Sequence, residues 1–157
     1  MLSAADQAKV LNSITFTAAG GGGSWIMGLS GELLTVPSTD ILPDTSPVSI
    51  ASGATLDLTG NSETIGPLSG SGGTVSLDAG TVTVNSSDGV NPVDTTFAGQ
   101  ITGSGGLVKD GGGTLTLRGV NTYGGSTIIE TGTLRLEGGL AAGAKIMPTG
   151  DSITNGS

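Results

Sequence analysis

The side chains that could do nucleophilic or acid–base chemistry in this chain are hydroxyls and carboxylates, because the sequence has no histidine and no cysteine. Their absence excludes disulfides, thiolate nucleophiles, the usual zinc ligand sets and a Ser-His-Asp triad completed within the chain. The glycine-rich segment 103–108 (GSGGLV) lacks the last glycine of a G-x-G-x-x-G loop. Calcium-binding nonapeptide repeats need Asp after the glycine pair, where segment 110–117 (DGGGTLTL) has Thr and Leu. We therefore expect no metal and no cofactor.

Ligand contacts could come from a few rings and acids. Trp25 and Tyr123 could stack on sugar rings, although a single ring is more often a coil cap or a corner plug. Four acidic side chains are expected to face water, either as solubilising charge or as a row that accepts hydrogen bonds from glycan hydroxyls: Asp57, Asp78, Glu130 and Glu137. The net charge of −8 argues against a nucleic-acid partner, since phosphate binding depends on clustered Lys and Arg.

Short strands must position these side chains. Residues 1–11 favour at most a short helical or irregular cap, because Ser3 to Asp6 resemble a capping box. From about Ile14, β-branched and aliphatic residues alternate with polar ones in short runs that end at glycine, a pattern that predicts strands with one buried face. The runs are 13–17, 55–58, 74–77, 81–84, 114–117 and 133–136.

One phrase recurs along the chain: small-Thr-aliphatic-polar-aliphatic-x-Gly. Its threonines are 19 residues apart in the pairs Thr55 and Thr74, Thr95 and Thr114, and Thr114 and Thr133. This step is typical of a solenoid repeat. With 30 glycines in 157 residues and 3% aromatic residues, a narrow aliphatic interior with tight glycine corners is expected. An antiparallel sandwich is the alternative, and we favour the solenoid because sandwiches do not usually repeat their strand sequences.

The solenoid interpretation assigns faces. Leu56 and Leu58 should lie inside, while Thr55, Asp57 and Thr59 should face solvent. Two segments fit the period poorly. Segment 20–47, with its glycine run and three prolines, is expected to form one or two irregular coils with a projecting loop, and segment 85–94 a second insertion. No stretch approaches the apolar length needed to span a bilayer, and any signal peptide is expected to lie upstream.

Segment 95–138 closely resembles the autotransporter-associated β-strand repeat, also called the passenger-associated transport repeat. The matching parts include F-x-G at 97–99, GSGGL-x-K at 103–109, GGTL-x-L-x-G at 112–119, NTY-x-G-x-T at 121–127 and GTL at 132–134. Counting more divergent stretches, the resemblance covers most of residues 12–138. It implies a right-handed parallel β-helix in an exported bacterial surface or secreted protein, with no enzymatic role for the repeat.

Segment 144–157 (AKIMPTGDSITNGS) is similar to the first conserved block of the SGNH, or GDSL-type, hydrolases. The resemblance makes Ser152 the nucleophile, with Gly150 and Asp151 in the same motif and residues 145–148 as the preceding strand. The later blocks, which supply the remaining oxyanion donors, the Asp and the His, do not follow. Without histidine, Ser152 cannot be activated in that family's manner.

These observations predict three regions: a cap at 1–11, a β-solenoid at 12–138, and a linker with the truncated start of a hydrolase domain at 139–157. The expected function is a non-catalytic stalk on the outside of a bacterium. The alternatives are an accessory region of a carbohydrate esterase, or an adhesion module that binds carbohydrate or a cell surface. Unpaired strand edges at the end of a solenoid also predict end-to-end self-association.

Overall fold

The computed structural model describes residues 42–140 and 145–148, together with the strands 17–18, 25–29, 33–35 and 153–155. Within these residues the chain is all-β, with parallel strands wound into a β-solenoid of about 5 turns and no helix. This confirms the expected fold class. The cap expected at residues 1–11 lies outside the described residues.

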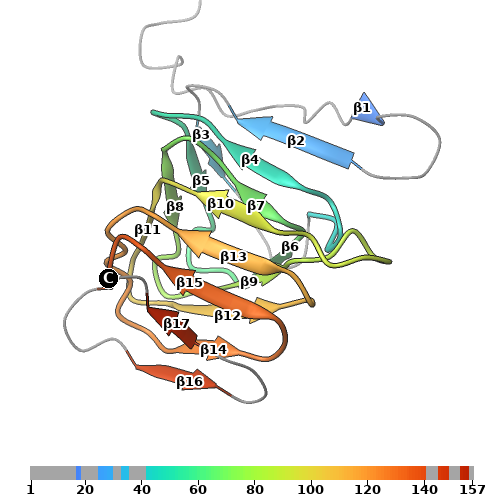
Figure 1. Cartoon of the computed structure of the whole chain (residues 1–157). Coiled ribbons are helices and arrows are strands. Elements are labelled where there is room, and N and C mark those ends of the chain that lie inside the picture. The colour runs from blue at the N-terminus through green and yellow to red at the C-terminus, as the bar shows by residue number, and fades with distance from the viewer. Residues whose placement is uncertain are drawn as a thin grey trace, which may run out of the picture.

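The strands fall on three faces of the solenoid, which stack along its axis (Figure 1). The first face carries β1 (Thr17–Ala18), β2 (Trp25–Leu29), β4 (Val48–Ile50), β7 (Leu68–Ser69), β10 (Thr95–Phe97), β13 (Thr114–Leu117), β15 (Thr133–Leu136) and β17 (Ile153–Asn155). A bridge between Gly70 and Phe97 joins its two halves. The second face carries β3 (Leu33–Thr35), β5 (Thr55–Asp57), β8 (Thr74–Ser76) and β11 (Gln100–Thr102). The third carries β6 (Glu63–Ile65), β9 (Thr81–Asn85), β12 (Gly106–Asp110), β14 (Thr127–Ile129) and β16 (Ile146–Pro148).

Strand pairing decides between the two folds that the sequence left open. Every pair of strands from β2 onward is parallel, and only β1 pairs antiparallel, with β2. Parallel partners one coil apart exclude the antiparallel sandwich. Segment 20–47, expected to be irregular, contributes β2 and β3 to the sheets through pairing with β4 and β5.

The register confirms most of the threonine spacing. Thr55 is paired with Thr74, and Thr114 with Thr133, in each case 19 residues on. The expected pairing of Thr95 with Thr114 is wrong, because Thr95 is paired with Leu115. This coil is one residue longer, so Thr95 shares a column with an inward leucine, and its hydroxyl is buried without a partner among the described residues.

The core is a stack of aliphatic side chains from all three faces. Leu56 and Leu58 are fully buried, Thr55 and Asp57 are half-buried and Thr59 is exposed, as the alternation predicts. The register arranges inward residues in columns such as Leu56, Val75 and Ile101 on the second face, and Leu115 and Leu134 on the first. Each coil therefore buries apolar surface against the coils on both sides of it.

Glycine columns let the corners of successive coils stack. A Cβ added to Gly105 would overlap the backbone oxygen of Gly80, and one added to Gly125 would overlap that of Gly105. The same holds at a second corner, where Gly119 faces the oxygen of Gly99 and Gly138 that of Gly119. The high glycine content thus follows from backbones that touch where a side chain would otherwise begin.

The expected insertion at 85–94 is a compact loop that leaves the sheets intact. Ser87 and Pro92 form an antiparallel bridge, and the carboxylate of Asp88 accepts hydrogen bonds from the backbone N–H groups of Val90 and Asn91. The loop raises the step between paired residues to 25, from Thr81 to Gly106, and β12 still pairs with β9 along its full length.

The parallel pairing continues beyond residue 138. Strand β16 pairs with β14, and β17 pairs with β15, so both add to the faces of the preceding coils. Among the described residues, no helix is long and apolar enough to cross a membrane. The end-to-end association expected from unpaired edges stays a prediction.

Candidate functional site

The motif singled out for chemistry cannot be placed. Gly150, Asp151 and Ser152 lie outside the described residues, so their geometry supports no mechanism. The strands on either side of the motif, β16 and β17, lie on the third and first faces of the solenoid. The role of Ser152 as a nucleophile therefore stays a prediction.

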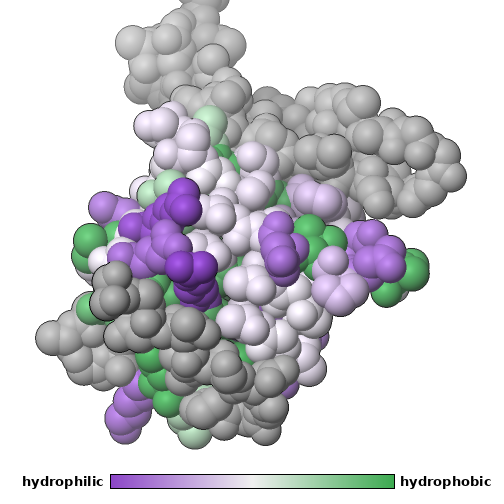
Figure 2. All heavy atoms as spheres, viewed as in Figure 1, coloured by the Kyte–Doolittle hydropathy of each residue, from purple (hydrophilic) through white to green (hydrophobic). Residues whose placement is uncertain are grey.

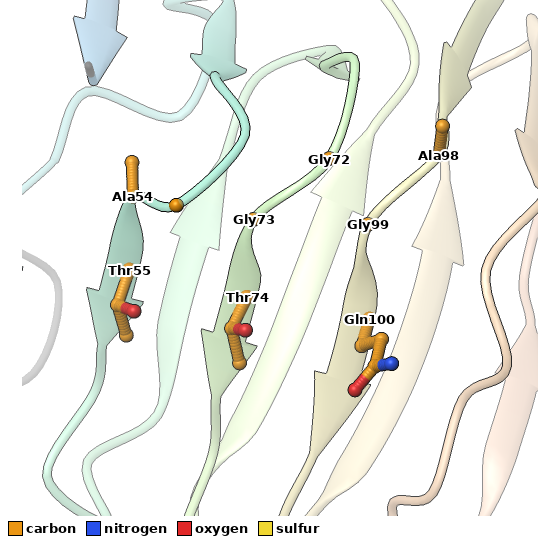
Figure 3. Close-up of a pocket in the computed structure, with 9 residues that line it drawn as sticks. Ala54, Thr55, Gly72, Gly73, Thr74, Ala98, Gly99 and Gln100 are labelled. Carbon is orange, nitrogen blue, oxygen red and sulfur yellow. The ribbon is translucent and has the colours of Figure 1, made fainter. Parts of the chain in front are cut away.

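A groove crosses one corner of three successive coils and is the main hollow of the described surface (Figure 3). Its volume is about 330 Å³, and it lies where β5, β8 and β11 begin. The register aligns the side chains of Thr55, Thr74 and Gln100 along its rim, where they lie side by side. The small residues at the groove are Gly53, Ala54, Gly72, Gly73, Ala98 and Gly99.

A second polar row lies beside the first on the same face, two residues further along each strand. The register pairs Asp57 with Ser76 and Ser76 with Thr102. Side chains two residues apart in a strand share a face, so both rows point outward. The outer surface of β5, β8 and β11 thus carries hydroxyl, amide and carboxylate groups in a regular array.

The acidic residues expected in water are largely solvent-facing, and two of them have local partners. Asp57 accepts a hydrogen bond from the backbone N–H of Thr59 at 2.9 Å. Glu137 contacts Arg118 at 2.7 Å and Arg135 at 3.1 Å, and the hydrogen bond from Arg118 holds the pKa of Glu137 below its ordinary value. Asp78 and Glu130 are exposed. These four residues lie on separate strands and corners and do not converge on one site.

Tyr123 is a corner plug, and the alternative of a stacking platform is wrong for this residue. Its side chain is 1% exposed, and its hydroxyl shares a hydrogen bond with that of Thr127 at 2.6 Å. Burial raises the pKa of Tyr123. The other ring considered for sugar binding, Trp25, lies on β2, and its side chain is outside the described residues.

Sequence reasoning missed Lys109, a fully buried cation in an aliphatic column. It occupies an inward position of β12 between Val84 and Ile129. Its ammonium donates hydrogen bonds to the backbone oxygens of Asp110 at 2.8 Å, Gly111 at 2.6 Å and Thr131 at 3.1 Å. An ammonium has three donors, so these oxygens match its capacity. The side chain therefore ties the corner after β12 to the corner of the next coil.

Lys109 predicts a rise in stability with pH. Burial lowers the pKa of Lys109 from 10.5 to about 8, so between those two values the unfolded chain holds a proton that the folded chain has lost. The free energy of unfolding should therefore increase across this window, by up to about 3 kcal/mol. Urea unfolding from pH 7 to 10.5 should show this rise relative to Lys109→Met, which shares every other titrating group. Parallel pH profiles for the two proteins would contradict the assignment.

Asn121 is a second polar residue that the sequence did not single out. It is fully buried, its side-chain oxygen accepts a hydrogen bond from the backbone N–H of Ile101 at 3.0 Å, and its amide donates to Gly119 at 3.0 Å. The second face has no strand beyond β11 among the described residues. Asn121 thus supplies with its side chain a hydrogen bond that a neighbouring strand would otherwise accept.

The described surface is mostly polar. Figure 2 shows one side of the molecule as largely white to purple, with hydrophobic residues in small spots. No cluster of three or more potential metal-ligating side chains occurs within the described ranges.

The coils from β12 to β15 contain the buried lysine, the buried asparagine and the tyrosine plug. Residues 107–136 match the family model of the passenger-associated transport repeat. The sequence resemblance to this repeat is thereby confirmed over the matched residues, whereas the resemblance of 144–157 to a hydrolase block is not confirmed. No curated protein and no solved structure matches the chain. The polar residues that organise the corners, Lys109, Asn121 and Tyr123, all belong to the matched passenger-associated transport repeat.

Proposed function

We propose that this chain is a non-catalytic stalk or passenger segment of an exported bacterial protein, displayed on the cell surface or secreted. The observation that carries the proposal is the match of residues 107–136 to the passenger-associated transport repeat, on coils of a continuous parallel β-solenoid. Backbone ladders and an aliphatic stack run along the axis, so neighbouring coils resist displacement together. Such a segment holds whatever it is joined to at a distance from its anchor.

Absence of cysteine and the modest size of the interior agree with export before folding. A chain without cysteine forms no disulfide that would obstruct passage through a narrow pore. Each coil finds its pairing partners in the coil already formed, so the solenoid can fold by adding one coil at a time. Both features support export as an unfolded chain followed by folding outside.

Surface display tests this proposal. The segment, carrying an epitope at its N-terminus, is fused to an outer-membrane anchor, and intact cells are probed with an antibody and with a protease. We expect a displayed, protease-resistant segment for the natural sequence and for the matched variant Gly124→Ala, and loss of resistance for Gly125→Ala, which disturbs a corner. A Gly125→Ala segment that is displayed and resists protease equally would show that the folded solenoid is not what matters.

The alternative, an accessory region of an SGNH-type carbohydrate esterase, draws on the motif at Gly150 to Ser152 and makes its own prediction. The 157-residue chain should not hydrolyse acetyl or p-nitrophenyl esters above background, because it has no histidine to activate Ser152. The assay compares the chain with Ser152→Ala. Hydrolysis that Ser152→Ala removes would contradict the non-catalytic proposal, and equal background rates would agree with it.

A further inference from the structure

We propose that the groove and the two polar rows beside it form a binding site for an extended, uncharged polysaccharide. The site lies on the outer surface of β5, β8 and β11, and its rows are Thr55, Thr74 and Gln100, then Asp57, Ser76 and Thr102. This inference adds a ligand to the proposed stalk and does not depend on export or on display.

The polar groups of these rows are available to a ligand. The side chains of Thr55, Thr74, Ser76, Gln100 and Thr102 make no hydrogen bond with another residue in the part of the chain that the structure describes, and each is at least half-exposed or partly exposed. Asp57 has one backbone partner at its Oδ1. Hydroxyl and amide groups both donate and accept hydrogen bonds, which is the capacity that sugar hydroxyls require.

The spacing of the rows suits a repeating ligand. Strands of neighbouring coils lie about 4.8 Å apart, so equivalent side chains recur at that interval along the axis. This interval is close to the length of one sugar ring in an extended glycan. A chain lying along the groove would therefore present a new ring to each coil, and Figure 3 shows the three coils side by side with their polar side chains in line.

Charge selects against anionic glycans. The rows contain one carboxylate, Asp57, and no cation, and the chain carries a net charge of −8. The surface cations of the described solenoid, Arg118, Arg135 and Lys145, all lie beyond β12, on coils that the groove does not cross. A uronate or sulfated chain would meet repulsion with no compensating contact, so a neutral chain is favoured.

The glycines at the groove have a structural reason of their own and do not carry the inference. A Cβ at Gly99 would crowd the backbone oxygens of Gly72 and Gly73, both at 2.5 Å, so these corners must be glycine for the coils to stack. The prediction depends instead on the polar side chains at the rim. These can be altered without touching the corner glycines.

Binding of neutral hexasaccharides tests the site. Cellohexaose, chitohexaose, xylohexaose and mannohexaose are titrated into the full chain by isothermal calorimetry, with a galacturonate hexamer as the anionic comparison. We expect at least one neutral hexamer to bind, and the double variant Thr74→Val with Gln100→Ala to weaken that binding at least tenfold. The galacturonate hexamer should bind more weakly than the neutral one.

The matched control removes two hydroxyls from another face. Thr114 and Thr133 are also paired in register, on β13 and β15, so Thr114→Val with Thr133→Val should leave the affinity unchanged. All variants are first compared by urea unfolding, so that loss of fold is not read as loss of binding. Absence of binding to every neutral hexamer, or equal losses in both double variants, would overturn the proposal while leaving the stalk function to the display assay.

Discussion

Gly125→Ala is expected to destabilise the solenoid by about 3 kcal/mol or more, because a new Cβ has to displace backbone. A Cβ at Gly125 would overlap the backbone oxygen of Gly105, and the N–H of Gly125 donates to that same oxygen at 2.9 Å. Two coils would have to separate at this corner. Backbone cannot move aside as the end of a flexible side chain can, so the adjacent ladders would also be disturbed.

The neighbouring residue provides the control. A Cβ at Gly124 would have its nearest atoms at 3.9 Å and 4.0 Å, which is ordinary contact. Gly124→Ala should therefore be neutral or stabilising by up to about 1 kcal/mol, since alanine restricts the unfolded chain. Urea unfolding of the two variants measures the difference. Similar stabilities for both would show that the corners do not stack as described.

Leu115→Asp is the second substitution expected to have a large effect, at several kcal/mol. Leu115 is fully buried, and its partners in the register are Thr95 and Leu134 on the adjacent coils. A carboxylate at this position would have apolar neighbours and no cation, and burying an unpaired charge is among the most costly changes a core can suffer. Thermal or urea unfolding should show a much less stable protein.

Thr116→Asp is the matched substitution one residue later. Thr116 is half-buried on the outer side of β13 and is paired with Arg135 on β15. A carboxylate there would face solvent beside a cation, so stability should change by about 0.5 kcal/mol or less. Equal losses for Leu115→Asp and Thr116→Asp would mean that the inward and outward assignments are wrong.

Much of the fold could be predicted because local and global signals coincide in a solenoid. The alternation that buries Leu56 and Leu58 also sets the face of their partners, because each strand pairs with its equivalent one coil away. The recurring threonine marks the start of strands that stack, as with Thr55 and Thr74. One short repeat thus specifies strand, face and neighbour together.

The register failed where one coil differed by one residue. Thr95 looks like the other phrase-opening threonines, yet it pairs with Leu115 and faces inward. The pattern within a single strand does not reveal how many residues the following corner uses. Only the ring of Phe97, which shares an inward column with Leu117, fixes which residues of β10 point into the core.

The buried polar residues could not be predicted from pattern alone. Lys109 and Asn121 read as surface residues by type, and their partners are backbone groups of corners and strands up to 22 residues away. Such partners exist only once the coils are stacked. For the candidate site the limit was similar, since the polar rows were expected but the groove beside them results from the packing of three corners.

The loop between β9 and β10 shows that the length of a coil is not dictated by the sheets. The ladders close again on the far side of it, with Asn85 paired to Asp110 and the backbone of Val93 bonded to Ser86. A longer loop adds closure entropy only slowly, by about 0.6 kcal/mol for each doubling of its length. Residues 88–91 therefore mark a place where a foreign epitope or a small folded domain can be grafted while the scaffold beneath it keeps its register.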